Sequence, residues 1–323
     1  MRITRRHLQV SLAVLWLFDG ALQCQPIMFS RFLARGILTP AGTSQPTAIA
    51  APLHVVAELV SAHPALANGA FAVTQIVLGL ALFTRRFSRI ALAASIVWAL
   101  SVWIMGEGLG GLATGATLLT GAPGAALLYA VIAILAWPNR DPQGDDRPSW
   151  LALPAWCALW LTGAVLQLVN GNNNAMSFTM MLRAAQSGSP GWIAQIDRQL
   201  VQMRLPGWIA AGVIGIDVLV GIWALVPGWT RQISIVIGLV LTLTGWLLFE
   251  GLGDLTSGRA TDPNSGPLIV LLALAVLGAL GPSEIGSVHQ ESQPRPKGSQ
   301  EYAPRAPLSG ASLNVRSPET AGV

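Results

Sequence analysis

The chain has 323 residues, of which 52% are hydrophobic and only 11% are charged, and 19 basic residues stand against 15 acidic ones. Soluble domains carry about 25% charged residues, so this composition argues against a soluble domain and predicts a membrane protein. The excess positive charge lies in short clusters between apolar runs, without the interleaved aromatic residues of a nucleic-acid site. We therefore expect a lipid bilayer as the partner, and no nucleic acid.

Eight apolar runs predict membrane-spanning helices. They cover residues 8–24, 69–84, 89–106, 124–137, 150–168, 208–226, 232–249 and 267–281. Several runs are shorter than the roughly 20 residues that a span usually requires, so their helices must extend into flanking sequence or be broken. The expected fold class is an all-α membrane protein with eight transmembrane helices.

The basic clusters between the runs predict the orientation. "MRITRRH" precedes the first run, "TRRFSR" follows the second and "NRDPQGDDRPS" follows the fourth. With the amino terminus inside, 13 of the 19 basic residues are cytoplasmic and six are external, in agreement with the positive-inside bias. We predict a multi-pass protein of the cell membrane with both termini cytoplasmic. The first run is not expected to be a signal peptide, because Asp19 interrupts its apolar core.

A repeat with an offset of 143 residues connects the two halves of the chain. "EGLGGLATG" begins at Glu107 and "EGLGDLTSG" begins at Glu250. The same offset relates Gly20 to Gly163, Ala21 to Ala164, Trp103 to Trp246 and Gly115 to Gly258. We expect two tandem four-helix repeats, residues 1–139 and 150–281, joined by a cytoplasmic linker at 140–149. Because four spans is an even number, both repeats should insert the same way up, as parallel repeats do.

Segments outside the runs predict surface helices and a tail. Leu53, Val56, Ala57 and Val60 fall on one face of a helix, and in the second half Ile193, Ile196, Leu200 and Met203 do the same. Each half should therefore lay a short amphipathic helix on the outer membrane surface. Residues 282–323 are rich in Pro, Ser, Gly, Gln and Arg, which predicts a disordered cytoplasmic tail.

Glu107 and Glu250 stand at the ends of the third and seventh runs. A carboxylate at a helix C-terminus meets the negative end of the helix dipole, which is unfavourable. One interpretation is a paired-carboxylate site at the outer mouth of the protein, for a cation, a proton or a polar head group. The alternative is a structural turn in which each Glu bonds to loop amides or to an arginine, namely Arg31, Arg35 or Arg183.

Asp19 and Asp217 lie inside apolar runs, where an acid costs roughly 2.5–3.5 kcal/mol to insert at mid-membrane. The offset of 143 pairs Asp19 with Thr162 and Thr74 with Asp217. This pattern suggests one polar cluster inside the bundle, which would include the glutamines Gln23, Gln75 and Gln167. It could bind a proton or a quinone head group, or consist of neutral acids that hydrogen-bond between helices and serve packing.

Other chemistry is weakly indicated. His54, Glu58 and His63 could bind a metal ion, because His and Glu four residues apart share a helix face, but a solvated polar face is favoured. Cys24 and Cys157 have no metal-ligand or dithiol spacing. No nucleophile elbow, phosphate loop or dinucleotide fingerprint occurs, so intrinsic catalytic activity is not expected and no catalytic residue is predicted.

Phe18-Asp19-Gly20, the amphipathic segment that follows it and "LALFTRRFSRIAL" between the second and third runs resemble DoxX-like four-helix membrane units, here in tandem. The Arg-rich composition and the EGLG repeat are also similar to those of actinobacterial membrane proteins. The DoxX-like resemblance implies an accessory component of a membrane redox or envelope-stress system, with a quinone- or lipid-sized pocket. It also implies quinone as a possible cofactor and a peripheral oxidoreductase as a possible partner. A small-solute or proton-coupled transporter and a non-catalytic scaffold remain alternatives.

Overall fold

The computed structural model of the chain describes residues 3–139 and 146–280. The predicted tail at 282–323 and residues 140–145 of the predicted linker lie outside the described residues. Within the described ranges all regular secondary structure is helical, and no strand is present.

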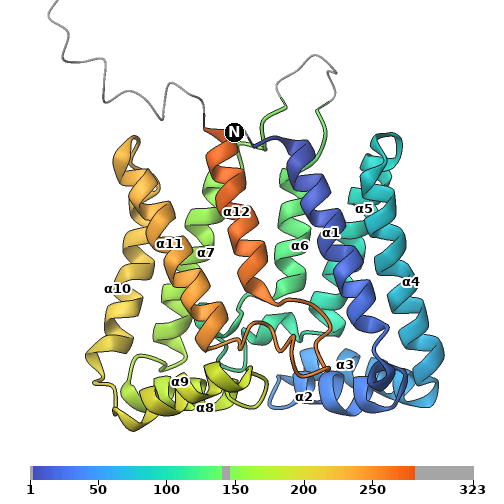
Figure 1. The fold of residues 1–323 in the computed structure, drawn as a ribbon, viewed down its shortest axis with the longest axis horizontal. Helices are drawn as coiled ribbons and strands as arrows, with labels where there is room; N and C mark the ends of the chain where they lie inside the picture. Colours follow the sequence, from blue (N-terminus) through green and yellow to red (C-terminus); the bar gives the residue numbers. More distant parts are fainter. Residues whose placement is uncertain (1–2, 140–145, 281–323) are drawn as a thin grey trace, which may run out of the picture. The chain divides into compact units, whose positions relative to one another are not determined.

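Long helices run side by side along one direction (Figure 1). They are α1 (Arg5–Gln23), α4 (Pro64–Phe83), α5 (Ser88–Met105), α6 (Ala125–Leu135), α7 (Ala152–Val169), α10 (Trp208–Trp223), α11 (Trp229–Leu248) and α12 (Ser265–Ala279). Each of them overlaps one of the predicted apolar runs. In the described part of the chain, four helical segments are long and apolar enough to cross a membrane: α4, Arg85–Met105, α7 and α11.

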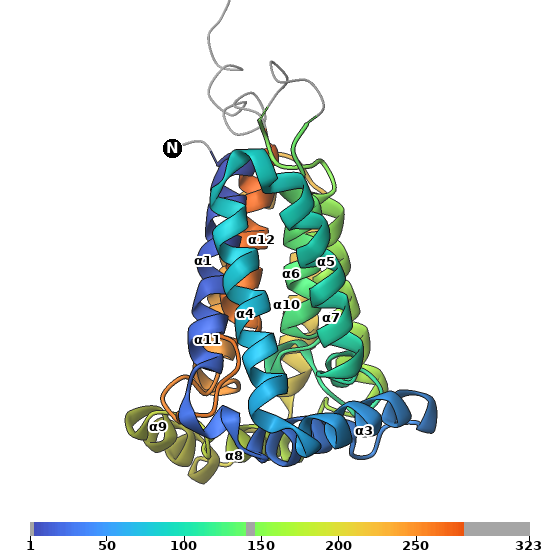
Figure 2. The same cartoon turned by 90° about the vertical axis from the view of Figure 1, so that its right-hand side faces the viewer.

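Shorter helices lie across one end of these long helices (Figures 1 and 2). They are α2 (Thr39–Gly42), α3 (Thr47–Ala62), α8 (Ala175–Ala185) and α9 (Gly191–Gln202). We call them the cap helices. Single helical turns complete the fold: η1 (Pro26–Phe29), η2 (Leu33–Leu38), η3 (Arg85–Phe87), η4 (Leu109–Gly111) and η5 (Leu118–Thr120).

The two amphipathic segments lie in the cap helices α3 and α9. In α3 the side chains of Leu53, Ala57 and Val60 are buried. In α9 and the residue after it, Ile193 and Asp197 are buried, whereas Ile196 and Met203 are exposed. Since α9 packs against α8 and α11, the face with Ile193 and Asp197 points inward, and contact of either helix with a membrane surface stays a prediction.

The long helices form two groups of four with the same pattern of neighbours. In the first group α1 and α5 each pack against both α4 and α6. In the second group α7 and α11 each pack against both α10 and α12. The groups are joined where α12 packs on α6, so that Ile132, Ala133, Leu268 and Leu272 belong to one continuous hydrophobic core. Close van der Waals packing of these side chains holds neighbouring helices of the bundle together.

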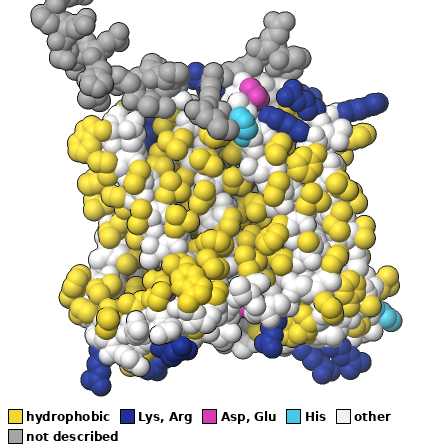
Figure 3. Space-filling model, in the orientation of Figure 1, with side chains coloured by type: hydrophobic (Ala, Val, Ile, Leu, Met, Phe, Trp, Pro, Cys, Tyr) yellow, Lys and Arg dark blue, Asp and Glu magenta, His cyan; other side chains and the backbone are white. Residues whose placement is uncertain are grey.

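Apolar side chains cover much of the face shown in Figure 3, and Lys and Arg side chains gather near its two ends. Four tryptophans near the helix ends, Trp137, Trp150, Trp208 and Trp229, are exposed. Aromatic side chains at such positions are typical of the boundary between an apolar layer and water.

Candidate functional site

Two loops contain the repeated EGLG sequence, and they share an unusual backbone. The Glu107 loop (residues 106–124) joins α5 to α6, and the Glu250 loop (residues 249–264) joins α11 to α12. In the first, Gly108 to Gly111 have φ values of 57, 58, 63 and 70°. In the second, Gly251 to Asp254 have values of 55, 60, 68 and 59°. Left-handed backbone costs an ordinary residue roughly 1–2 kcal/mol but glycine very little, which explains the glycines of the repeat.

Each glutamate binds the beginning of the next helix. Glu107 Oε1 accepts a hydrogen bond from the Ala126 amide at 3.0 Å, at the start of α6. Glu250 accepts from the Ser265 amide at 3.1 Å and from the Ser265 hydroxyl at 2.5 Å, at the start of α12. The expected unfavourable contact with the C-terminal end of a helix is therefore offset, because the loop carries each carboxyl to the positive N-terminal end of the following helix.

The structural alternative for these glutamates offered amides or arginines as partners. Among the described hydrogen bonds and contacts the partners include backbone amides where each loop meets the following helix, and neither glutamate pairs with Arg31, Arg35 or Arg183. A second contact recurs in both loops: the Trp103 indole N–H donates to the Pro123 carbonyl at 2.7 Å, and the Trp246 indole N–H donates to the Pro263 carbonyl at 2.8 Å.

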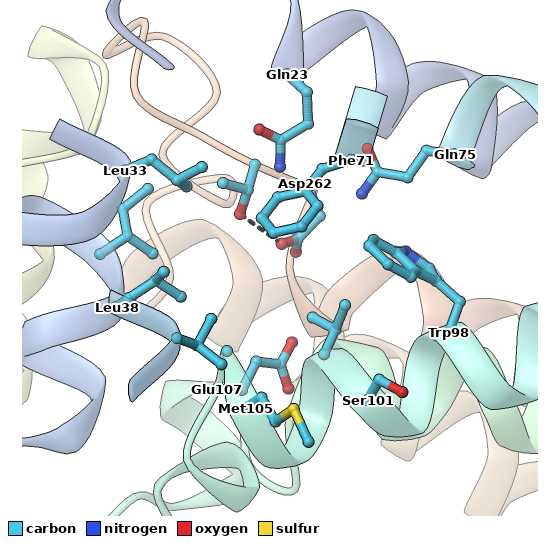
Figure 4. Close-up of a pocket in the computed structure, with 15 residues that line it drawn as sticks. Gln23, Leu33, Leu38, Phe71, Gln75, Trp98, Ser101, Met105, Glu107 and Asp262 are labelled. Atoms are coloured by element: carbon cyan, nitrogen blue, oxygen red, sulfur yellow. Dashed lines mark hydrogen bonds between the residues drawn. The ribbon is translucent and has the colours of Figure 1, made fainter. Parts of the chain in front are cut away.

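A cavity of about 280 Å³ lies beside the Glu107 loop, between the long helices of the first group and the cap (Figure 4). We call it the apolar cavity. Its apolar walls are formed by Leu33, Ile37, Leu38, Val56, Phe71, Val102 and Met105. Its polar groups come from Gln23, Gln75, Trp98, Ser101, Glu107, Thr261 and Asp262. Apolar walls with a few convergent polar groups are typical of small-molecule sites.

Several polar atoms at this cavity have no partner. Gln23 and Gln75 are 5% and 7% exposed, and the Oε1 atom of each is buried without a hydrogen bond. The same holds for Trp98 Nε1 and Glu107 Oε2. Figure 4 shows both glutamine amides directed into the space that Asp262 and Trp98 also face. An unpaired buried polar group lowers the stability of the folded state by about 1–3 kcal/mol. Polar atoms of a ligand that hydrogen-bond to these groups would therefore bind favourably.

A second cavity of about 380 Å³, the polar cavity, adjoins the first. Both cavities are lined by Ile37, Gly106, Glu107, Thr261 and Asp262. Glu250, Asp254 and Arg259 also line the polar cavity. Glu107 and Asp262 therefore stand in the wall between an apolar space and a polar one. The structure brings the two predicted glutamates to one cavity, with Asp262 interacting electrostatically with both.

Burial weakens the acidity of these carboxyls. Burial, and next the charge of Asp262, raise the pKa of Glu107 to about 8, although the Ala126 amide lowers it. Burial raises the pKa of Glu250 to about 7, against the lowering effect of its bonds to Ser265. Burial also raises the pKa of Asp262, although its carboxylate accepts from the Thr261 hydroxyl at 2.9 Å and the Asn264 amide at 2.8 Å. Near neutral pH, Glu107 is therefore largely protonated and able to donate a hydrogen bond.

The predicted cluster of Asp19, Asp217, Thr74 and Thr162 is not brought together. Asp19 is buried in α1 beside Tyr129 and interacts electrostatically with Asp262. Asp217 is buried in α10, next to a void of only about 10 Å³ that Glu250 also lines. The Thr74 hydroxyl donates to the Ala70 carbonyl of its own helix, and Thr162 is exposed. The reason is that α1 and α10 belong to different four-helix groups. Of the predicted polar side chains, Gln23 and Gln75 line the apolar cavity.

Asp262 and Trp98 were missed by the sequence analysis. Trp98 resembles any other apolar residue of its run, and no spacing marks it. A signal for Asp262 exists: it stands in "TDPNSG", between the Glu250 loop and the last run, where Asn264 caps α12 by accepting from the Ser265 amide at 2.9 Å. Glu250 binds the start of α12, and Asp262 stands in the loop just before that helix, so Asp262 must lie near Glu250.

The weak metal candidates are His54, Glu58 and His63, and all three are exposed. No group of three or more His, Cys, Asp or Glu side chains within residues 3–139 and 146–280 is arranged to hold a metal ion. Cys24 is exposed, Cys157 is buried, and both are free thiols.

Comparison with protein-family models, with curated proteins and with solved structures gives no match. The DoxX-like resemblance therefore stays a prediction, and the geometry of the two cavities is what supports an inference about function.

Proposed function

We propose that this chain is an eight-span protein of the cell membrane that binds a small, mostly apolar molecule of quinone or lipid size in the apolar cavity. The observation that carries this proposal is the pair of unpaired, buried amide oxygens of Gln23 and Gln75 in a space of about 280 Å³ with mostly apolar walls. A ligand with hydrogen-bond donors at one end would satisfy these oxygens and bury its apolar part against the walls.

Several features support the membrane architecture. Four helical segments are long and apolar enough to span a bilayer, and α1, α6, α10 and α12 run beside them (Figure 1). The charge count of the sequence favours cytoplasmic termini, which would place the cap helices at the outer surface. Two tandem repeats are supported by the equal loop contacts of Trp103 and Trp246, which are 143 residues apart.

A protein of this kind would act as an accessory component of a membrane redox or envelope-stress system, with a quinone as ligand or a peripheral oxidoreductase as partner. The unpaired groups of the cavity are suited to binding, and the proposal assigns no catalytic residue. A proton-coupled transporter is a second candidate. It is favoured by one observation: Glu107 and Asp262 lie in the wall between the polar and the apolar cavity.

The test replaces the unpaired amides. Gln75→Leu removes a buried polar group without a partner, so we expect the free energy of unfolding to rise by about 1–3 kcal/mol. We expect the double variant Gln23→Leu/Gln75→Leu to lose the small molecules that purify with the wild-type protein in mild detergent, measured by mass spectrometry.

Gln9 provides the matched control. It is also buried, but its Nε2 donates to the Ala136 carbonyl at 3.0 Å and its Oε1 accepts from Arg6 at 3.3 Å. Gln9→Leu should therefore lower stability and retain the ligand. The proposal fails if the double variant keeps the same molecules as wild type, and the scaffold alternative then stands. Proton-driven solute flux in proteoliposomes that Glu107→Gln abolishes would favour the transporter instead.

A further inference from the structure

The polar end of the apolar cavity contains acids but no bases. Among the described side chains that line it, Glu107 and Asp262 are the ionisable ones, and no Lys, Arg or His is present. A ligand with an anionic head would place its charge beside these acids, in a mostly apolar space without a counter-charge, which is strongly unfavourable. The lining thus disfavours phosphate and carboxylate head groups.

The same end presents unpaired hydrogen-bond donors and acceptors. The Trp98 indole N–H is a donor without a partner, and the Oε1 atoms of Gln23 and Gln75 are buried acceptors without one. Glu107 has one oxygen bound to the Ala126 amide and the other buried without a partner. A protonated Glu107 would add an O–H donor at that free oxygen. Carbonyl or ester oxygens of a ligand satisfy the donors, and its hydroxyl groups satisfy the acceptors.

We propose that the apolar cavity takes amphiphiles whose head group is uncharged and combines hydroxyl groups with carbonyl or ester oxygens, and that binding requires a proton held by Glu107 and Asp262. This inference rests on the proposed function and adds the ligand class and its regulation by protons. The proton reaches the pair from the polar cavity, which the same two side chains line.

The charged groups around the pair favour retention of this proton. The charge of Asp262 raises the pKa of Glu107, and two further acids, Glu250 and Asp254, line the polar cavity beside the pair.

Nearby basic side chains do not neutralise Glu107 and Asp262. Arg259, the one basic side chain among the described residues lining the polar cavity, is exposed, with its guanidinium 5.6 Å from the centre of the Phe32 ring. The cap elements next to the cavities bring Arg35 of η2 and His54 of α3, both of which are exposed.

A pH dependence follows. Burial places the pKa of Glu107 at about 8, so the protonated form dominates at pH 6. At one pH unit above the pKa only about a tenth of the protein is protonated, and the apparent affinity falls by the same fraction, roughly tenfold. Affinity is thus fully present at low pH and is lost as the pH rises through the pKa of Glu107.

The experiment measures equilibrium binding to the full-length protein in nanodiscs at pH 6 and pH 9, against empty nanodiscs. The probes are a decyl-substituted benzoquinone, monodecanoylglycerol and decanoate. We expect at least one neutral probe to bind at pH 6 and to bind about tenfold more weakly at pH 9, with no binding of decanoate at pH 9, where its head is ionised. The neutral probe that binds distinguishes a quinone from a glyceride head group.

Glu107→Gln keeps a hydrogen-bond donor but cannot ionise, so its affinity should be the same at both pH values. Glu58→Gln, an exposed glutamate of α3 that lines neither cavity, is the matched control and should keep the wild-type pH dependence.

Equal affinity of the wild-type protein at both pH values, or a pH dependence that Glu107→Gln retains, would overturn the proton requirement and leave the proposed function standing. Binding of decanoate at pH 9 as tight as that of a neutral probe would overturn the head-group selection. If no neutral probe binds at pH 6 to wild type or to Glu107→Gln, the proposed function fails with it.

Discussion

The two four-helix groups share one loop motif, the EGLG turn with its glutamate and tryptophan contacts, and have very different interiors. Beside the Glu107 loop, the polar side chains of Gln23, Gln75 and Trp98 face a cavity of about 280 Å³. The residues 143 positions later are Leu166, Val218 and Leu241, all apolar. The void beside Asp217 and Glu250 measures only about 10 Å³, and the cavity of about 310 Å³ that Leu166 lines has mostly apolar walls. Both groups therefore have the loop that connects two of their helices through a glutamate. Only the first group has a polar lining beside that loop, so we expect recognition of a ligand in the first group only.

The largest effect on stability is expected from alanine substitutions of loop glycines, which test whether the backbones of the two loops are equally constrained. A Cβ at Gly110 or Gly253 would strike the backbone of Pro123 or Pro263, and both glycines have left-handed φ, 63° and 68°. Gly110→Ala and Gly253→Ala should each lower the free energy of unfolding by roughly 3 kcal/mol or more, because strain and overlap add. Chemical denaturation of purified protein in detergent measures this change.

Gly171 separates the two causes. Its φ is also 68°, but nothing lies within 4 Å of the Cβ position. Gly171→Ala should cost only the backbone strain, roughly 1–2 kcal/mol. If Gly110→Ala and Gly171→Ala are equally mild, the close approach to Pro123 does not stabilise the loop.

A smaller effect distinguishes the two glutamates. The folded-state pKa values, about 8 for Glu107 and about 7 for Glu250, lie above the ordinary value of 4.5. The folded protein therefore binds these protons more tightly, and the stabilisation present below pH 4.5 is lost as the pH rises through 8 and 7 respectively. At pH 9, Glu107→Gln should raise the unfolding free energy by roughly 2–3 kcal/mol and Glu250→Gln by less.

The measurement is the thermal unfolding midpoint at several pH values from 4 to 9. Glu58→Gln, which changes an exposed side chain, should leave the curve unchanged. A curve for Glu107→Gln that parallels wild type from pH 4.5 to pH 8 would contradict the raised pKa.

The smallest effect tests the contact that both loops share. Trp103→Phe and Trp246→Phe each remove one indole hydrogen bond to a proline carbonyl and should cost about 1 kcal/mol, equally in both groups. Trp98→Phe is the control for the loss of an indole N–H, because Trp98 Nε1 has no partner, and its unfolding free energy should not fall by this amount. Unequal losses of unfolding free energy in the Trp103 and Trp246 variants would show that this hydrogen bond does not stabilise the two loops equally.

The helices were largely predictable from the sequence, because apolar runs bounded by Gly, Pro and charged residues specify where long helices lie. The chemistry of the loops was less predictable. Glu107 was expected to lie at the negative, C-terminal end of the helix dipole of α5. The turn of residues with left-handed φ places its carboxyl at the start of α6 instead. Asp19 and Asp217 do not form the expected polar cluster, because an offset in sequence does not tell which helices become neighbours. Gln23 was found because a polar side chain in an apolar run is visible, whereas Trp98 was hidden among apolar residues.

The bond between Glu107 and the first turn of α6 has a mechanical consequence. It ties the end of α5 to the start of α6, so this pair of helices forms a rigid hairpin on one side of the apolar cavity. The opposite wall comes from Leu33, Ile37 and Leu38 of η2, where Leu33 and Leu38 belong to a second buried cluster with Ala57 and Val60 of α3. One wall of the cavity is therefore held by a side-chain hydrogen bond to a long helix, and the facing wall by apolar packing against the cap.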